Sequence, residues 1–140
     1  DLKIKQFIVT TSGRESLEPL LKTSLNSYLI YFSDIITYED VQNHKPFPDA
    51  YNLAVKKSNE SCENCIAIED SGIGVDSALA AKINCLLTLP PWTSSIKNIT
   101  NKANACVDNL GNNDNHSKII YGKPLFSKNV DFNYLTTIIN

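Results

Sequence analysis

Three groups of polar residues in this chain are of types that could bind an anion or a metal ion. They are the run Thr10-Thr11-Ser12, the single Lys45, and the pair Glu69-Asp70. Hydroxyls and backbone N–H groups at the start of a helix bind anions, and a lysine ammonium neutralises a phosphate as a point charge. Two adjacent carboxylates are costly to bury unless a cation compensates them, and their hard oxygens suit Mg²⁺. The residue types therefore indicate magnesium-assisted phosphate chemistry.

Each of the three groups also has a simpler structural explanation. Ser12, with Glu15 three residues later, matches a capping box, so the hydroxyl run could do no more than cap a helix. Lys45 could be an ordinary surface lysine, and Asp70 could cap the helix that follows it. No single group decides between these explanations. The case for chemistry rests on the order of the groups and on where the expected strands end.

Apolar patterning predicts the elements that position these groups. Short apolar runs predict strands, and apolar residues at helical spacing predict helices. Strands are expected at residues 6–10, 34–37, 65–68, 83–89 and 105–107, and helices at 14–25, 49–57 and 72–81. This alternation, with continuously apolar strands, predicts an α/β fold in which helices cover both faces of a parallel sheet. Ligands of such sheets bind at the carboxyl ends of the strands, at or near which the three polar groups fall.

The composition is that of one small globular domain without a strong charge. The 140 residues are 42% hydrophobic, enough for a single core. The net charge of −2 provides no basic surface for nucleic acid or an anionic membrane, so neither is expected as a partner. Cys62 and Cys65 have Cys-x-x-Cys spacing without a second pair of zinc ligands, and Cys85 and Cys106 lie in apolar runs. Without a secretory signal, we expect reduced thiols and a cytoplasmic location, or the plastid stroma in a plant-type host.

In this order, the three groups resemble motifs two, three and four of the haloacid dehalogenase (HAD) superfamily. The motifs read Phe7-Ile8-Val9-Thr10-Thr11-Ser12, Lys45-Pro46-Phe47-Pro48-Asp49 and Ile66-Ala67-Ile68-Glu69-Asp70-Ser71-Gly72-Ile73-Gly74. The third is the most specific, and the likeness is greatest to the CbbY-like branch, near β-phosphoglucomutase and phosphoglycolate phosphatase. The resemblance covers about residues 5–112. We therefore expect a partial, Rossmann-like HAD core over 1–112 and leave the tail over 113–140 unassigned.

The resemblance implies a role in phosphate binding for four residues. Thr10 would hydrogen-bond the transferring phosphoryl group, with help from the Thr11 amide. Ser12 would touch the phosphate or the far end of the substrate. Lys45 would hold nucleophile and phosphate together and offset the charge that develops during transfer.

The resemblance also implies roles for residues near the metal and at two helix ends. Asp70 would bind Mg²⁺, with Glu69 as a second ligand or as its supporting partner. Asp49 would cap its helix rather than touch the substrate. Lys82 stands where the family usually has a glycine at the end of the motif-four helix, so a positive φ at this position would strain the lysine.

The residue that attacks phosphorus in this family has no counterpart here. HAD proteins carry an Asp nucleophile and a second Asp, which acts as acid and base, in an Asp-x-Asp-x-Thr motif. That motif and a helical cap domain both precede motif two. No Asp-x-Asp follows an apolar strand in this chain. We therefore expect the first strand and the cap to lie upstream of Asp1, and the given chain to be an inactive fragment.

The implied activity of the complete protein is Mg²⁺-dependent phosphomonoester hydrolysis of a small sugar phosphate through an aspartyl-phosphate intermediate. CbbY-like proteins suggest a sugar bisphosphate such as xylulose-1,5-bisphosphate. The alternatives are β-phosphoglucomutase-type phosphotransfer, dehalogenase chemistry, and a non-catalytic HAD-like binding module. Retention of Thr10, Lys45, Glu69 and Asp70 together favours an enzyme. A receiver-like domain is disfavoured because its acidic pair comes first in the chain.

Overall fold

The structure, a computed structural model, describes residues 4–91 and 102–139. Its strands are β1 (Gln6–Val9), β2 (Phe32–Ile36), β3 (Ile66–Glu69), β4 (Asn84–Thr88), β5 (Ala105–Val107) and β6 (Ile119–Tyr121). Its α-helices are α1 (Arg14–Ser24), α2 (Asp49–Ser58), α3 (Gly72–Ala80) and α4 (Phe132–Ile139). Between these elements lie the short 3₁₀ helices η1 (Asn26–Tyr31), η2 (Tyr38–Asp40) and η3 (Cys62–Asn64). The α/β fold class is confirmed, with every expected strand and helix present.

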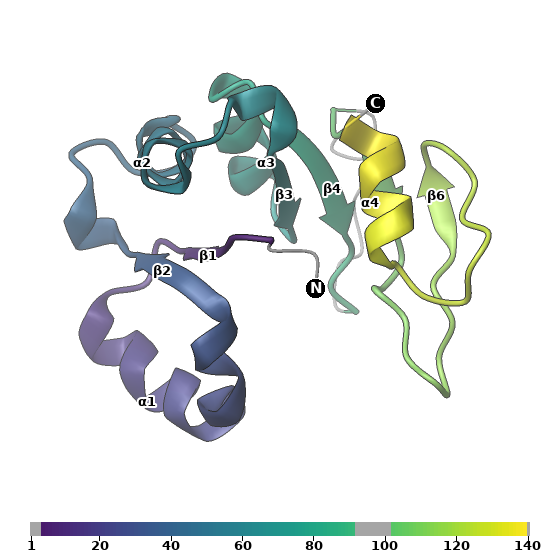
Figure 1. The fold of residues 1–140 in the computed structure, drawn as a ribbon, viewed down its shortest axis with the longest axis horizontal. Helices are drawn as coiled ribbons and strands as arrows, with labels where there is room; N and C mark the ends of the chain where they lie inside the picture. Colours follow the sequence, from purple (N-terminus) through teal and green to yellow (C-terminus); the bar gives the residue numbers. More distant parts are fainter. Residues whose placement is uncertain (1–3, 92–101, 140) are drawn as a thin grey trace.

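The strands form two sheets. In the first, β1 pairs with β2 in parallel. In the second, the order is β3-β4-β5-β6, with β3, β4 and β5 parallel and β6 antiparallel to β5. Among the described residues, β1 and β3 therefore each have one edge without a partner strand. Figure 1 shows β1 and β2 on the left and the larger sheet in the centre and on the right.

Helices cover both faces of the larger sheet, as the sequence predicts (Figure 1). Successive side chains of a strand point to opposite faces, so in β4 Cys85 and Leu87 pack in one cluster and Leu86 packs in another. The first cluster includes Val75 of α3, and the second includes Tyr134 of α4. The side chains of Cys85, Leu86 and Leu87 are each at most 2% exposed. The apolar strand is thus buried on both sides, as its continuously apolar sequence predicts.

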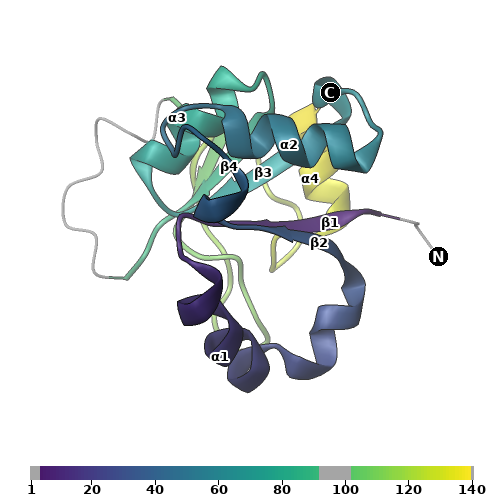
Figure 2. The same ribbon diagram turned by 90° about the vertical axis from the view of Figure 1, so that its left-hand side faces the viewer.

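The smaller sheet packs against α2 on one side. Ile36 of β2 is fully buried against Ala50 and Ala54 of α2, with Phe7 and Val9 of β1 at the edge of this cluster. Figure 2 shows α2 on one side of β1 and β2 and α1 on the other. Helix α2 also contacts α3. It therefore connects the two sheets through side-chain packing.

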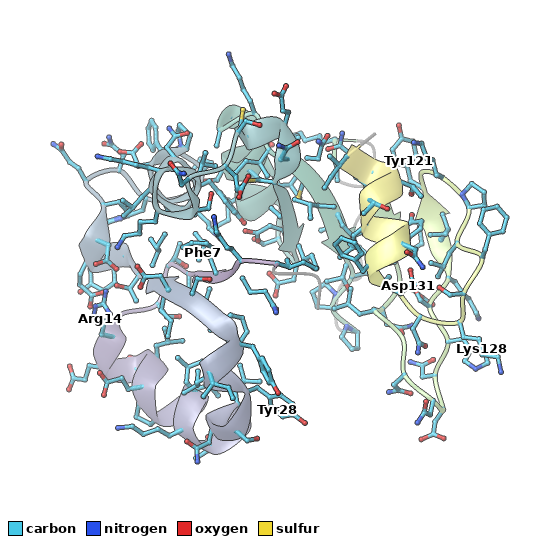
Figure 3. The ribbon with its side chains drawn as sticks, viewed as in Figure 1. Phe7, Arg14, Tyr28, Tyr121, Lys128 and Asp131 are labelled. Atoms are coloured by element: carbon cyan, nitrogen blue, oxygen red, sulfur yellow. The ribbon has the colours of Figure 1, made fainter. Side chains whose placement is uncertain are left out.

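The expected capping box at the start of α1 is wrong. The N-cap is Gly13, and no side chain caps the helix from that position. The Ser12 N–H instead donates to Thr10 Oγ1 at 3.0 Å, so Ser12 is held in a turn before the helix. The first-turn N–H of Arg14 finds its acceptor in Glu39 Oε1 at 3.1 Å, from η2. Figure 3 shows Arg14 at the η2 end of α1.

The start of α2 also differs from expectation. Asp49 is the first helical residue, the N-cap is Pro48, and no side chain caps the helix. The Asp49 carboxylate accepts a hydrogen bond from Asn43 Nδ2 at 3.0 Å instead. An acidic side chain in the first turn still favours the helix through the dipole. Asp49 therefore stabilises the helix without capping it.

The tail that sequence patterning left unassigned completes the larger sheet. Strand β6 pairs with β5, and α4 contacts β3 and β4. Tyr134 is 4% exposed, and its hydroxyl donates to the Lys123 carbonyl at 3.1 Å.

In the described part of the chain, no helix is long and apolar enough to cross a membrane.

Candidate active site

Lys45 joins the carboxyl ends of two strands from different sheets. Its Nζ donates to the Val9 carbonyl of β1 at 3.0 Å and to Glu69 Oε1 of β3 at 2.5 Å. The side chains of Lys45 and Glu69 are each only 7% exposed. Prolines on either side of Phe47 fix the backbone that follows Lys45, because they restrict φ and exclude helix before Pro48. The lysine is therefore a buried bridge and not a surface charge.

Glu69 is enclosed by partners. Its Oε1 accepts from Lys45 and also from the Tyr51 hydroxyl. A Cβ built on Gly74 would lie 1.8 Å from Glu69 Oε2, so the carboxylate occupies the space that a side chain on α3 would fill. Burial, with the adjacent Glu69 charge, raises the pKa of Tyr51 far above its usual value, so Tyr51 is a permanent donor.

Asp70, the neighbour of Glu69, is exposed. Within the described part of the chain, its carboxylate makes no hydrogen bond or ion pair. Ser71 caps α3, since its Oγ accepts from the Gly74 N–H at 3.2 Å. The cap role that Asp70 could have filled is thus taken by Ser71. The Asp70 oxygens remain available for another ligand.

The predicted residues surround one cavity of about 270 Å³. Its lining includes Thr10, Thr11, Lys45, Glu69 and Asp70, together with Ser71 and Thr88 at the end of β4. The cavity thus brings together five of the six residues that the sequence singles out. The sixth, Ser12, is exposed and is not part of the lining.

Two of the hydroxyl residues that line the cavity, Thr10 and Thr11, lie at the end of β1. The Thr10 N–H continues the pairing with β2 by donating to the Ile36 carbonyl at 2.9 Å, which fixes where its side chain points. Its Oγ1 already accepts from Ser12 N–H and keeps a proton to donate. Thr11 is exposed at the mouth. This end of β1 can therefore supply donors to an anion in the cavity.

The side chains fit Mg²⁺ through Asp70 more readily than through Glu69. Within the described residues, no group of three or more His, Cys, Asp or Glu side chains could hold a metal ion. Mg²⁺ in phosphate-transfer sites takes one or two carboxylates and completes its shell with water and phosphate oxygens. Asp70 has free oxygens for this purpose, whereas Glu69 is paired with Lys45 and Tyr51.

None of the four cysteines lines this cavity. All four are free thiols, and Cys85 and Cys106 are buried as expected. Burial, with the Glu69 charge nearby, raises the pKa of Cys85 to about 12. The Cys85 thiol therefore stays protonated and unreactive.

Tyr51 and Gly74 are the residues that sequence reasoning missed. Tyr51 lies two residues after Asp49, at the start of α2, and shows no feature of its own among the apolar residues of that helix. In the sequence, Gly74 looks only like a residue that opens a helix. The roles of Tyr51 and Gly74 become visible only where β3 approaches α2 and α3. A tyrosine near the motif lysine is the one signal that could have been noted, as a possible hydrogen-bond donor.

These features define an α/β domain with a polar cavity at the carboxyl ends of parallel strands. The chain matches the model of the haloacid dehalogenase-like hydrolase family over residues 1–88. It belongs to this family.

Relatives with known names agree with this assignment. The chain is 28% identical over 91 residues to a CBBY-like protein of Arabidopsis thaliana, an alignment that covers 65% of this chain and 28% of the relative. It is 36% identical over 83 residues to the phosphorylated carbohydrates phosphatase of Thermotoga maritima, covering 58% of this chain and 37% of that protein. The chain therefore spans well under half the length of these curated relatives.

Solved structures share the fold. CbbY from Rhodobacter sphaeroides, in complex with xylulose-(1,5)bisphosphate, superposes with a TM-score of 0.60 at 27% identity, over 65% of this chain and 41% of that one. β-Phosphoglucomutase from Clostridium difficile superposes with a TM-score of 0.55 at 22% identity, over 92% of this chain and 56% of that one. The second likeness shows a shared fold alone.

Proposed function

We propose that the full-length protein containing this chain is a Mg²⁺-dependent phosphatase of small phosphorylated sugars. One observation carries the proposal: Lys45 joins the ends of β1 and β3 at the cavity that also holds Thr10 and Asp70. A cation, hydroxyl donors and a free carboxylate around one cavity suit a phosphate ester and its metal. The phosphatase of phosphorylated carbohydrates among the relatives supports the substrate class.

In this proposal, the chain's own side chains bind and orient the phosphoryl group. The Thr10 hydroxyl and the Thr11 backbone N–H donate to its oxygens. Lys45 has three N–H donors, and two already have acceptors in Val9 and Glu69. The third can donate to a phosphoryl oxygen and offset the charge that develops there.

Asp70 would hold Mg²⁺, which when bound neutralises charge on the phosphoryl oxygens. Glu69 would act as the partner of Lys45 and support the metal site from behind. This assignment prefers the second of the two roles that the family resemblance leaves open for Glu69. The burial of Glu69 between Lys45 and Tyr51 supports it.

We propose that the nucleophile comes from a strand outside residues 1–140. The unpaired edges of β1 and β3, whose carboxyl ends Lys45 joins, would accept a parallel strand between them. Ile68 of β3, an apolar residue that lines the cavity, is 45% exposed and would be available to contact such a strand. By the family resemblance, that strand would bring the Asp that forms the aspartyl phosphate and the Asp that acts as acid and base.

The proposal also covers the substrate class, the partners and the location of the protein. The substrate would be a small phosphorylated metabolite, without nucleic acid or membrane as partner. The proposed location is the cytoplasm, or the plastid stroma in a plant-type host. The four free cysteines suit such a reducing compartment.

The test is phosphate release by the purified full-length protein from a panel of phosphorylated sugars, including xylulose-1,5-bisphosphate and fructose 1-phosphate. We expect release that stops with EDTA and returns with added Mg²⁺. β-Glucose 1-phosphate is included because conversion to glucose 6-phosphate without phosphate release would point to mutase chemistry instead. No turnover of any compound would replace the enzyme with the non-catalytic binding module.

A further inference from the structure

We propose that Tyr51 is a positioning residue of this site, whose buried hydroxyl fixes Glu69 so that Lys45 keeps one N–H free for the phosphoryl group. The inference rests on the proposed function and deepens it. Tyr51 lines no part of the cavity. It would therefore act only through Glu69 and Lys45.

Tyr51 contacts both members of the buried ion pair. Its side chain, 6% exposed, lies in the first turn of α2 and donates its hydroxyl proton to Glu69 Oε1. This is the same oxygen that accepts from Lys45. The Lys45 Nζ also lies 5.0 Å from the centre of the Tyr51 ring, within the range of a cation–π contact. The hydroxyl therefore holds the anion while the ring faces the cation.

The other side of the carboxylate is closed by α3. Glu69 Oε2 lies where a Cβ of Gly74 would be, so the first turn of α3 blocks rotation in that direction. Glu69 is thus fixed between a hydroxyl from α2 and backbone from α3. Removing the hydroxyl takes away one of the two donors to Glu69 Oε1 without altering either helix backbone.

Without the Tyr51 hydroxyl, the Glu69 carboxylate would interact more strongly with Lys45. A buried acceptor that loses a donor is costly unless another donor replaces it. Lys45 is the remaining donor to Oε1, so we expect it to move closer to Glu69 and away from Val9 and the cavity. Because Lys45 is proposed to act most strongly on the developing charge, the loss should fall on kcat more than on KM.

The experiment compares the full-length wild type with Tyr51→Phe in Mg²⁺-dependent hydrolysis of p-nitrophenyl phosphate. Tyr51→Phe keeps the ring and removes only the hydroxyl. We expect kcat to fall about tenfold, the scale of one hydrogen bond to a charged group, with KM changing less than about twofold. Assays are run well below the Tm of the least stable variant.

Tyr134→Phe is the matched control. Tyr134 is also a buried tyrosine whose hydroxyl has an acceptor, the Lys123 carbonyl, but it lies in α4 outside the cavity. We expect it to lose stability on a scale similar to Tyr51→Phe while keeping the wild-type kcat. An equal fall of kcat in both variants would mean a general structural effect and would overturn the proposal.

A double variant tests whether Tyr51 acts through Glu69. In a Glu69→Gln background, Tyr51→Phe should change kcat by less than about twofold, because the charged acceptor is already gone. A full tenfold loss in that background, or an unchanged kcat in Tyr51→Phe alone, overturns the positioning role. Absence of wild-type turnover would instead overturn the proposed function itself.

Discussion

Lys82 is a residue in a conformation that favours glycine. Its φ is 60°, and it follows the end of α3, where its N–H donates to the Leu79 carbonyl and the Ile83 N–H donates to the Ala78 carbonyl. This pair of hydrogen bonds is a Schellman motif, whose left-handed position is usually glycine. The positive φ on which the family resemblance made strain depend is therefore present at Lys82.

We predict that Lys82→Gly raises the free energy of unfolding by about 1 kcal/mol, since the left-handed conformation costs a side chain about that much. Urea denaturation measures the change. Asn59, with a φ of 57° at the end of α2, is the comparison. Because asparagine tolerates this region, Asn59→Gly should gain only a few tenths of a kcal/mol. Equal gains at both positions would contradict the strain at Lys82.

The Asp70 carboxylate gives the second prediction at this scale. It is exposed at the cavity, and its oxygens lack a protein partner within the described residues. We expect Asp70→Asn in the full-length protein to lower Mg²⁺-dependent turnover at least about a hundredfold, because the amide supplies weaker and uncharged oxygen ligation. Titration of the protein with Mg²⁺ by calorimetry should show a matching loss of affinity.

Asp76→Asn is the control for Asp70. Asp76 lies on α3 and pairs with Lys102 at 2.9 Å, away from the cavity lining. It should keep both turnover and Mg²⁺ binding. Wild-type behaviour of Asp70→Asn would remove Asp70 from the metal site.

The sequence predicts residues whose chemistry is unusual for their place, and misses those that depend on another element. Lys45 before a proline and the carboxylate pair after an apolar strand can be recognised from local context alone. Tyr51 and Glu39 cannot, because each finds its partner more than ten residues away, in Glu69 and in the Arg14 N–H. The helix cap predicted at Ser12 is wrong for the same reason, because Glu39 from η2 accepts the hydrogen bond from the Arg14 N–H.

At the scale of an element, α3 is shaped by what it packs against. In an ordinary helix, replacing a glycine such as Gly74 with alanine would raise the free energy of unfolding by about 1 kcal/mol. Here an added Cβ would lie 1.8 Å from Glu69 Oε2. We therefore predict that Gly74→Ala lowers the free energy of unfolding by about 2 kcal/mol, the scale of an overpacked core.

Truncating the acidic side chain tests that explanation. In a Glu69→Ala background the clash is gone, and Gly74→Ala should become neutral or stabilising in the same urea experiment. A cost that persists without the Glu69 carboxylate would place the problem elsewhere in α3.

Helix η2 contains an acid-sensitive link to α1. Asp40 accepts from the Thr37 N–H, the Thr37 hydroxyl and Arg14 Nη2, each at 2.8 Å. The Thr37 backbone hydrogen bond, with smaller contributions from Arg14, lowers the pKa of Asp40 to about 2. A lowered folded-state pKa stabilises the fold above the unfolded-state value near 4. That stabilisation is lost as pH falls from there through 2.

We predict that Asp40→Asn lowers the free energy of unfolding by about 1 kcal/mol at neutral pH, a value reduced for the partly solvated pair with Arg14. The difference from wild type should shrink between pH 4 and pH 2. Asp114→Asn, at an exposed loop position, should show no such pH-dependent difference. A deficit that stays constant down to pH 2 would exclude the charge of Asp40 as its cause.

Elements whose own apolar pattern determines them were predicted, and elements that depend on a neighbour were not. Strand β4 and helix α2 match their expected positions because each buries its own apolar side chains. Strand β6 has only three residues, two of them exposed, and exists through its pairing with β5. Figure 3 shows Tyr121 of this strand at the opposite end of the molecule from Arg14 and α1.

At the scale of the whole molecule, the expected single sheet is divided into two between β1 and β3. The sequence predicts the strands and their polar ends, but the pairing of β1 with β2 and of β3 with β4 comes only from long-range contacts. The two parts are held together by α2 and by the Lys45 bridge. The proposed inserted strand would join the two parts into one sheet, parallel except for β6.

Backbone direction in β1 allows a direct test of that strand. Alternate residues of a strand direct their N–H groups to opposite sides. Since the Thr10 N–H donates to Ile36 of β2, the Ile8 N–H also faces β2 and the Val9 N–H faces the unpaired edge. The Val9 carbonyl, which Lys45 reaches from that edge, agrees with this direction.

We predict that the Val9 amide exchanges its hydrogen quickly in the isolated 1–140 chain and slowly in the full-length protein, whereas Ile8 is the protected amide in both. NMR-detected hydrogen exchange measures the two sites in the same sample, so Ile8 corrects for any difference in global stability. The isolated chain should also release no phosphate from the sugar phosphate panel, because the proposed nucleophile lies on the inserted strand. Equal protection of Val9 in both proteins, or phosphatase activity of residues 1–140 alone, would contradict insertion of a catalytic strand between β1 and β3.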